Sequence, residues 1–242
     1  MKEDKIIKVN NTKKICRGKK ILDISEFSVY KNKFNFIIGG NGSGKTTLLN
    51  ILSLIDQNYI GEIYYQGRKI DKTEENLELR RKFSVIWQDP YLYRGDVFYN
   101  IALPLKLRDY PEEEINDLVK DMAVKIEIES LLDQSAHTLS GGERQKVSIA
   151  RALITEPEIL FVDEATTNLD EESINFFNSH FADLVTDEMT VVMVSHDRRQ
   201  IKELADYVNL LRQGKVILSE KRNNFNFNLF GAGIREPIEE IV

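Results

Sequence analysis

Continuous runs of apolar residues divide this chain into predicted strands. Residues 159–162 and 190–195 are apolar almost throughout, and polar residues follow both runs. This pattern is typical of strands that are buried on both faces of a parallel sheet. Residues 34–38 predict another buried strand. Because ligands of parallel sheets gather at the carboxyl ends of the strands, the residues after these runs are the first candidates for a functional site.

Shorter apolar stretches predict further strands with a helical region between them. The predicted strands are bounded by turn-forming residues, and they cover residues 6–9, 24–29, 61–65, 83–87, 208–211 and 215–218. The last two are joined near Gly214 and predict a closing hairpin. Residues 90–155 lack strand alternation, and we interpret them as a helical subdomain inserted in an α/β core.

Within the helical region, one helix has a clear start signal. Pro111 is followed by three glutamates, residues 112–114, and then by apolar residues at helical spacing. We expect residues 1–220 to form a single domain and residues 221–242 to form a tail. In that tail, Phe225 and Phe227 alternate with asparagines, a pattern that fits a one-sided strand and a frayed terminus equally well.

Composition narrows the class of protein. The chain has 242 residues, 42% of them hydrophobic, so it can bury a core, and its net charge of -6 gives no general attraction to nucleic acid. A single cysteine excludes an internal disulfide framework. No apolar run approaches the ~20 residues needed to span a bilayer, and we expect a cytosolic protein. For the basic run over residues 13–20, a solvated strand face is favoured over a docking patch.

The first candidate site follows the strand at residues 34–38 and fits the phosphate-binding P-loop pattern G-x-x-x-x-G-K-[ST]. Its residues are Gly39, Gly40, Asn41, Gly42, Ser43, Gly44, Lys45 and Thr46, and Thr47 comes next. The glycines let the backbone amides surround an anion. Lys45 adds a positive charge, Thr46 offers a hydroxyl to Mg²⁺, and the apolar residues from Leu48 on start a helix whose positive end faces the phosphates.

Two further stretches add chemistry to a P-loop protein. Asp163 and Glu164 follow an apolar strand, so Asp163 can hold Mg²⁺ and Glu164 can act as general base toward the attacking water. Ser140 and Glu143 have capping-box spacing, and Gly141 and Gly142 lie between them. This is a second helix N-terminus suited to phosphate. The chain therefore binds two phosphates, or two copies of it share one nucleotide.

Together these motifs resemble the ATP-binding subunit of an ABC transporter. The matching segments, in order, are the Walker A motif at residues 39–46, the Q-loop at Gln88, the signature at residues 139–145, the Walker B motif at residues 159–164, the D-loop at residues 168–170 and the switch histidine His196. The resemblance implies an α/β fold: a P-loop NTPase core with a mainly parallel sheet, an N-terminal antiparallel β subdomain and the inserted helical subdomain.

The resemblance also implies partners and residue roles. In this family two copies form a head-to-tail dimer, in which the P-loop of one copy and Ser140, Gly141 and Gly142 of the other enclose each ATP. Gln88 senses Mg²⁺ and the attacking water, His196 contacts the γ-phosphate, and Asp170 links the two sites. The implied partners are ATP, Mg²⁺, a second copy of the chain, membrane permease subunits that hold it at the inner face of the membrane and, for an importer, an extracytoplasmic binding protein.

Three positions depart from the family pattern. Cys16 stands where an aromatic residue usually stacks on adenine, which should weaken ATP binding by about 1 to 3 kcal/mol. Gly40 and Ala165 stand where proline is common. Neither change removes a chemical group.

Several functions remain open at this stage. Residues 88–105 resemble the permease-facing region of importer subunits for tungstate, molybdate and related oxyanions, so an importer ATPase is the leading hypothesis. An exporter or lipoprotein-release ATPase is the alternative. A soluble ABC ATPase acting on DNA or ribosomes is disfavoured by the single motif set and the negative charge. A small-molecule P-loop kinase would have no use for the signature helix.

Overall fold

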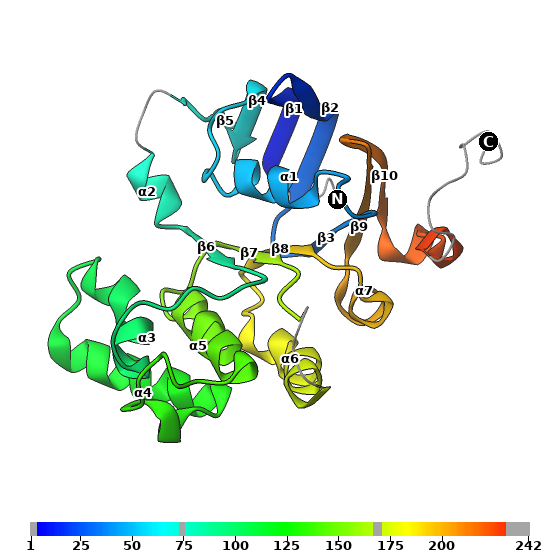
Figure 1. Ribbon diagram of the computed structural model, residues 1–242. Coiled ribbons are helices and arrows are strands. Elements are labelled where there is room, and N and C mark those ends of the chain that lie inside the picture. Colours follow the sequence, from blue (N-terminus) through cyan, green and yellow to red (C-terminus); the bar gives the residue numbers. More distant parts are fainter. Residues whose placement is uncertain (1–3, 73–75, 167–170, 231–242) are drawn as a thin grey trace. The chain divides into compact units, whose positions relative to one another are not determined.

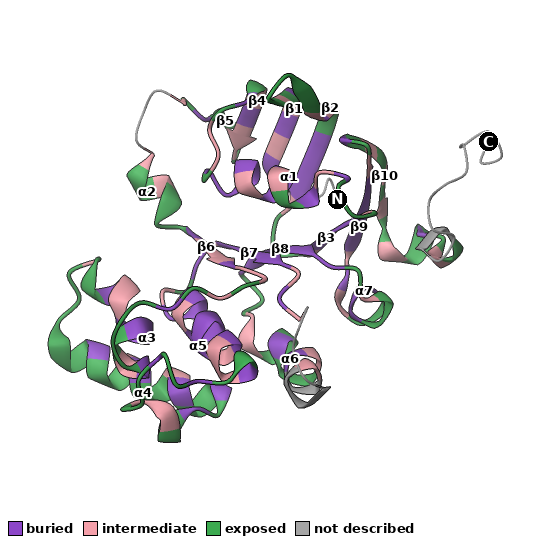
Figure 2. Cartoon of the chain, in the orientation of Figure 1, coloured by how far each residue is buried: buried purple, intermediate pink, exposed green. Residues whose placement is uncertain are grey.

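The computed structural model describes residues 4–72, 76–166 and 171–230 (Figure 1). The chain divides into two units, one made of residues 1–71 and 194–242 and the other of residues 72–193. Figure 2 shows that β3 and β9 in the first unit and β7 and β8 in the second are largely buried. None of the helices within the described residues combines the length and apolar character that crossing a bilayer requires.

The first unit contains an antiparallel sheet in the order β2-β1-β4-β5. Its strands are β1 (Lys5–Cys16), β2 (Lys19–Tyr30), β4 (Ile60–Tyr65) and β5 (Arg68–Lys69). β1 and β2 are longer than the predicted strands because the tight turn at Arg17 and Gly18, both with positive φ, carries the pairing to its end. An N-terminal antiparallel region was predicted and is confirmed.

A second group of strands in the same unit carries the P-loop. β3 (Phe34–Ile38) pairs in parallel with β9 (Tyr207–Arg212), and β9 pairs in antiparallel with β10 (Lys215–Lys221). The predicted closing hairpin is therefore confirmed. The helices of this unit are α1 (Lys45–Leu52) and α7 (Arg198–Leu204), and α1 contacts β2.

The second unit combines short parallel strands with the helical region. Its strands lie in the order β8-β7-β6, and β6 pairs with β7 in parallel. The strands are β6 (Phe83–Ile86), β7 (Ile159–Asp163) and β8 (Thr190–Val194). Every residue of β7 and β8 is buried, as their continuous apolar runs predict.

Helices account for most of the remaining residues of this unit. They are α2 (Leu77–Arg80), α3 (Val97–Lys106), α4 (Glu112–Ile126), the 3₁₀ turn η1 (Glu129–Leu131), α5 (Gly141–Leu153) and α6 (Glu171–Leu184). α4 begins just after Pro111 with its glutamates in the first turn, as predicted. α5 packs against α3, α4 and β6, so the predicted helical region has a core of its own.

The start of the tail differs from the strand that its alternating phenylalanines suggest. Residues after β10 form two 3₁₀ turns, η2 (Arg222–Asn224) and η3 (Phe227–Phe230). Phe225 is buried and its ring meets Phe227 edge-on at 5.2 Å between centroids. The Asn226 side chain accepts a hydrogen bond from the backbone N–H of Asn228, and such local bonds favour turns over strands. Residues 231–242 of the tail lie outside the described residues.

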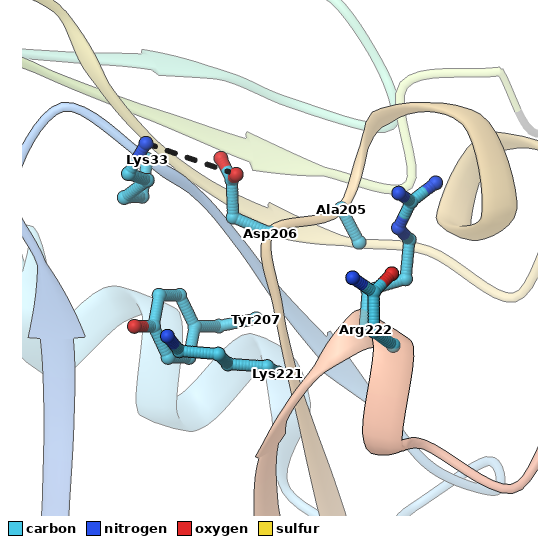
Figure 3. A pocket seen from close by; sticks show the side chains of 7 residues that line it. Lys33, Ala205, Asp206, Tyr207, Lys221 and Arg222 are labelled. Carbon is cyan, nitrogen blue, oxygen red and sulfur yellow. Dashed lines mark ion pairs between the residues drawn. The ribbon is translucent and has the colours of Figure 1, made fainter.

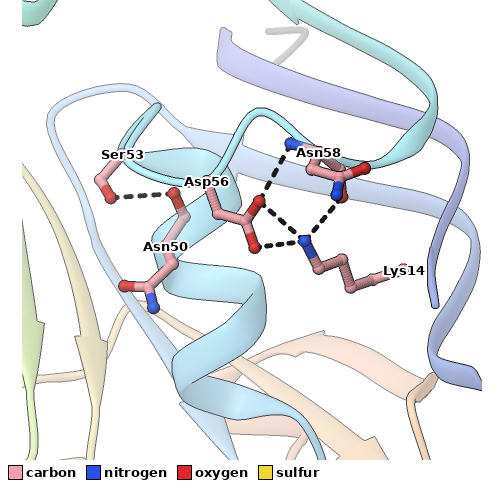
Figure 4. Close-up of polar contacts among 5 residues, drawn as sticks. All are labelled: Lys14, Asn50, Ser53, Asp56 and Asn58. Carbon is pink, nitrogen blue, oxygen red and sulfur yellow. Dashed lines mark hydrogen bonds and ion pairs between the residues drawn. The ribbon is translucent and has the colours of Figure 1, made fainter. Parts of the chain in front are cut away.

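One lysine of the basic run has a structural role (Figure 4). Lys14 Nζ lies 2.6 Å from the Asp56 carboxylate and donates to Asn58 O at 2.7 Å. Only 12% of the Lys14 side chain is exposed. Asp56 also accepts the N–H of Asn58, so this cluster fixes the turn that follows α1. The expectation of a solvated face is therefore wrong for Lys14, because β1 places it against that turn.

Candidate functional site

The P-loop backbone has a shape that requires glycine at two of its positions. Gly39 has φ 154° and Gly44 has φ 104°, values that L side chains rarely adopt. A Cβ atom on Gly39 would lie 2.1 Å from Leu211 O, and one on Gly44 would lie 2.7 Å from the Leu22 side chain. The glycines therefore let the loop pass close to β9 and β2.

The loop is also held from outside by the β9–β10 turn. The N–H of Gly214 donates to Ser43 O at 2.9 Å, and Gly214 O accepts the N–H of Asp23 at 2.8 Å. A Cβ atom on Gly214 would lie 2.2 Å from Ile21 O. The sequence marks Gly214 as a hairpin residue, but its contact with the P-loop joins residues far apart in the chain and was not predicted.

Polar groups of the P-loop converge on the start of α1. Lys45 is buried, and its Nζ donates to the carbonyl oxygens of Gly39 at 3.1 Å and Gly40 at 3.3 Å. Ser43 Oγ is buried and has no hydrogen-bond partner among the described residues. Within the described part of the chain, no side chain caps the first turn of α1, whose N-cap is Gly44. A lysine folded over the loop, an unpaired hydroxyl and uncapped helix amides together fit the phosphates of ATP.

The residues after this loop complete the phosphate-facing group predicted for the first unit. Thr46 is exposed and Thr47 is half-buried, both in the first turn of α1. Asn41 and Gly42 are exposed in the loop before it. The Thr46 hydroxyl therefore has the exposure that a metal ligand beside a nucleotide needs.

In the second unit, two predicted site segments share one edge of the sheet. Ile86 at the end of β6 pairs with Val162 of β7 in parallel register. Gln88 and Glu164 each lie two residues beyond that pair, so they leave the sheet at the same edge. Asp163 is 4% exposed, and Glu164 has φ 45°, a left-handed conformation that is uncommon for residues other than glycine. Such backbone strain is concentrated at functional sites.

The donor set suits Mg²⁺ held together with a nucleotide. Among the residues that the structure describes, no three His, Cys, Asp or Glu side chains gather as a metal site. Mg²⁺ does not need such a cluster, because it is usually bound by one or two carboxylates plus substrate phosphates and water. The second unit offers one buried carboxylate of this kind, on Asp163, and the first unit offers the exposed hydroxyl of Thr46.

The signature helix has the capping box that its spacing predicts. The Glu143 N–H donates to Ser140 Oγ at 3.3 Å, and Glu143 Oε2 accepts the Ser140 N–H at 2.7 Å. The Ser140 hydroxyl donates to the same carboxylate at 2.8 Å. Ser140 and Gly141 are exposed at the N-terminus of α5, whereas Gly142 is buried. The start of α5 is thus an open helix terminus that can face an anion.

Two arginines of α5 bind the segment that follows Gln88. Arg151 Nη2 donates to Tyr91 O at 2.7 Å, and Arg144 Nη2 donates to Pro90 O at 3.4 Å. Burial lowers the pKa of Arg151 below its ordinary value, and its guanidinium lies 5.5 Å from the Tyr93 ring centroid. The signature helix and the Q-loop segment are therefore mechanically linked. Sequence reasoning missed both arginines because their partners are backbone oxygens 54 and 60 residues away.

His196, the predicted switch histidine, is exposed on a turn held by buried neighbours. Ser195 Oγ donates to Gln200 Oε1 at 2.7 Å and accepts the N–H of Asp197 at 3.0 Å. Asp197 caps α7 by accepting the Arg199 N–H at 2.7 Å. These bonds fix the backbone on both sides of His196. Ser195 and Gln200 were not predicted as positioning residues.

The remaining two candidates are Cys16, which the structure describes, and Asp170, which it does not. Cys16 is exposed at the end of β1, beside the Arg17–Gly18 turn. Asp170 lies outside the described residues. The P-loop, Cys16 and His196 belong to the first unit, and Gln88, Ser140, Asp163 and Glu164 belong to the second.

Restoring an aromatic ring at Cys16 tests whether this exposed position faces the base of the nucleotide. Cys16→Tyr is expected to tighten ATP binding by about 5- to 150-fold, since base–aromatic stacking contributes ~1 to 3 kcal/mol. Fluorescent ATP titration measures the change. Cys16→Ser, which adds no ring, should leave the affinity near the starting value. Equal affinities in both variants would mean that another residue holds the base.

Comparison with known proteins agrees with the family that the motifs resemble. The model of the ABC transporter family matches residues 22–167. The tungstate uptake system ATP-binding protein TupC of Peptoclostridium acidaminophilum is 36% identical over 87% of this chain and 96% of its own length. The lipoprotein-releasing system ATP-binding protein LolD of Aquifex aeolicus is 35% identical over 88% of this chain and 96% of its own length.

Solved structures agree with the fold. The dimeric post-hydrolysis structure of the ATP-binding cassette MJ0796 with ADP and Pi has a TM-score of 0.81 and 28% identity, covering 90% of this chain and all of that one. The structure of cbiO1 from Clostridium perfringens, described as part of the ABC transporter complex cbiONQ, has a TM-score of 0.81 and 27% identity. The match covers 91% of this chain and 90% of the cbiO1 chain.

Proposed function

The chain belongs to the ABC transporter family as an ATPase, and from this premise we propose that it dimerises around two ATP molecules to drive a membrane permease that imports a small oxyanion. The observation that carries the ATP-dependent part is the P-loop. Its glycine backbone, buried Lys45 and unpaired Ser43 hydroxyl form a phosphate cradle at the start of α1. The transport part rests on similarity to TupC.

The chain's own residues divide the work of hydrolysis. Lys45 exchanges its bonds to the loop carbonyls for bonds to phosphate oxygens and neutralises their charge. Glu164 accepts a proton from the attacking water, and Gln88 at the same sheet edge orients that water. His196 donates a hydrogen bond to the γ-phosphate from the turn that Ser195 and Gln200 hold. Phosphoryl transfer depends mainly on this positioning and charge neutralisation.

Mg²⁺ is the cofactor that this residue set would hold. Thr46, Asp163 and Gln88 are the proposed contacts, with Asp163 as the only carboxylate among them. When bound, the ion neutralises charge on the phosphate oxygens. Asp163 is buried at the end of β7, whereas Glu164 is half-buried and has a left-handed backbone, so one acid can serve the metal while the other serves water.

The second copy supplies the closing half of each site. Ser140, Gly141 and Gly142 at the start of α5 offer amides and a hydroxyl to the γ-phosphate of the partner copy, and Asp170 links the two sites. Support comes from the open N-terminus of α5 and from the dimeric state of MJ0796. To donate to phosphate, the Ser140 hydroxyl must leave the Glu143 carboxylate that it contacts at 2.8 Å.

A groove in the second unit is the proposed permease contact. It encloses about 250 Å³ between β6, α3 and α5, and its walls include Tyr93, Leu103 and Leu107. Tyr91 and Leu107 are 66% and 67% exposed, large values for apolar and aromatic side chains. Arg144 and Arg151 of the signature helix bond to the backbone of Pro90 and Tyr91, beside the groove. Through these bonds, movement of a permease in the groove is transmitted to the helix that begins after Ser140. The proposed localisation is therefore the cytoplasmic face of the membrane.

Transport direction has one competing candidate. Similarity to LolD favours a lipoprotein-releasing or export role instead, whereas TupC and the methionine import protein MetN 2 of Bacillus cereus favour import. The chain covers 65% of MetN 2, so that relative has additional sequence. A binding protein outside the membrane is a partner only under the import hypothesis.

Reconstitution decides between these directions. The chain is purified with the permease encoded beside its gene and placed in vesicles with ATP on the side that the chain faces. We expect ATP-dependent movement of tungstate or molybdate toward that side, stimulated by a cognate binding protein. Movement of solute or lipoprotein away from the chain would support the export candidate. A rate of ATP hydrolysis that the permease does not change would contradict both the import and the export candidate.

A further inference from the structure

A basic pocket lies on the first unit (Figure 3). It encloses about 230 Å³ and is formed where the turn before β3, the turn before β9 and the end of β10 meet. Its lining residues are Lys33, Ala205, Asp206, Tyr207, Lys221, Arg222 and Asn223. The pocket is at the amino ends of the parallel strands β3 and β9, whereas the P-loop follows the carboxyl end of β3. It is therefore distinct from the nucleotide-binding residues of this unit.

The lining of this basic pocket is positive, because it includes three cationic side chains and one carboxylate. That carboxylate, on Asp206, accepts the N–H of Phe34 at 2.9 Å and lies 3.9 Å from Lys33 Nζ. The Asp206 backbone also pairs with Phe34 O and with the Arg222 N–H. Asp206 thus holds the walls together.

The pocket walls are ordered by aromatic and backbone contacts. Tyr207 is buried and stacks on Tyr30 with 3.7 Å between ring centroids. Arg222 Nη1 donates to Lys202 O at 2.6 Å, which orients its guanidinium. Lys33 and Lys221 are exposed, so an anionic group from outside can reach both. A rigid wall with two reachable ammonium groups is suited to carboxylates on a flexible segment.

We propose that the basic pocket binds the acidic segment at residues 236–240 of the same chain, which goes beyond the transport function. The described chain ends at Phe230, shortly after the pocket residue Asn223. Residues 231–242 contain Glu236, Glu239 and Glu240 against one arginine, a charge complementary to the pocket. Glu236 and Glu240 lie six and ten residues beyond Phe230, so an extended tail can carry them up to about 20 Å and about 35 Å from it. Tethering raises the local concentration to roughly millimolar, so individually weak ion pairs are sufficient.

Zero-length crosslinking of the full chain tests this directly. A carbodiimide joins a lysine Nζ to a glutamate carboxylate as an amide with loss of water, and peptide mass spectrometry locates the bond. We expect Lys33 or Lys221 to crosslink to Glu236, Glu239 or Glu240 within one chain, at a yield independent of protein concentration. Lys31, exposed in the same turn but outside the pocket, is the control. Yields equal to that of Lys31, or bonds only between isotopically distinct copies, would overturn the proposal.

Peptide binding gives a second, independent readout. A labelled peptide of residues 231–242 should bind the full chain at least 5-fold more tightly when the chain's own Glu236, Glu239 and Glu240 are replaced by glutamine, because the pocket is then vacated. Adding Lys33→Gln and Lys221→Gln to that variant should abolish the gain. Equal binding by all variants, or displacement by millimolar inorganic phosphate but not by salt of equal ionic strength, would overturn the proposal. ATP hydrolysis is measured alongside, and its loss would bear on the transport function rather than on this pocket.

Discussion

Replacing Glu164 with glutamine is expected to lower the turnover number of ATP hydrolysis by about 100- to 10,000-fold, the range that general-base catalysis supplies. Glutamine keeps the size of the side chain and one acceptor oxygen, and it replaces the other oxygen with an NH₂ donor, so it cannot accept the proton of water at neutral pH. The strained backbone at Glu164, with φ 45°, is kept because only the head group changes. ATP affinity should therefore remain, since Lys45 and the P-loop are untouched.

Phosphate release under single-turnover and steady-state conditions measures this loss, and equilibrium dialysis measures binding. Glu188→Gln is the matched control, because Glu188 is exposed in the loop before β8 and has no assigned role. It should hydrolyse ATP at the starting rate. Turnover by Glu164→Gln within threefold of that control would remove Glu164 from the role of base.

The second large effect is expected at Gly39. Gly39→Ala places a Cβ atom 2.1 Å from Leu211 O in a backbone conformation with φ 154°, so the loop must move away from β9. Strain of this kind costs about 1–3 kcal/mol, and displacement of the amides should weaken ATP binding by at least ~10-fold. Thermal unfolding should also occur at a lower temperature.

Gly40→Ala is the matched comparison in the same loop. No atom lies within 4 Å of a Cβ atom at Gly40, and its φ is not positive. Gly40→Ala should lower the unfolding temperature and the ATP affinity much less than Gly39→Ala does. Equal effects from the two alanines would show that the approach of Gly39 to β9 does not shape the site.

Sequence alone predicted those parts of the site that local rules determine. The P-loop glycines, the capping box of Ser140 and Glu143, and the buried strands before Asp163 and His196 depend on neighbouring residues and on spacing along the chain. Each is confirmed as local structure. The α/β class and the closing hairpin follow for the same reason, because continuous apolar runs predict buried parallel strands.

Contacts between distant segments could not be predicted in this way. The Gly214 amide that holds Ser43, and the arginines of α5 that hold the segment after Gln88, bond to backbone oxygens, which have no sequence signal. Lysine side chains are usually exposed to solvent, yet β1 places Lys14 against Asp56. These groups position the predicted site residues, so the sequence identifies the chemistry and the fold supplies its support.

The central claim is that ATP brings two copies of this chain together. Light scattering of Glu164→Gln measures this most directly, because hydrolysis no longer ends the ATP-bound state. The mass should be 28.0 kDa without nucleotide and twice that value with Mg²⁺ and ATP. A mass that remains at 28.0 kDa while dialysis shows ATP bound would contradict the account.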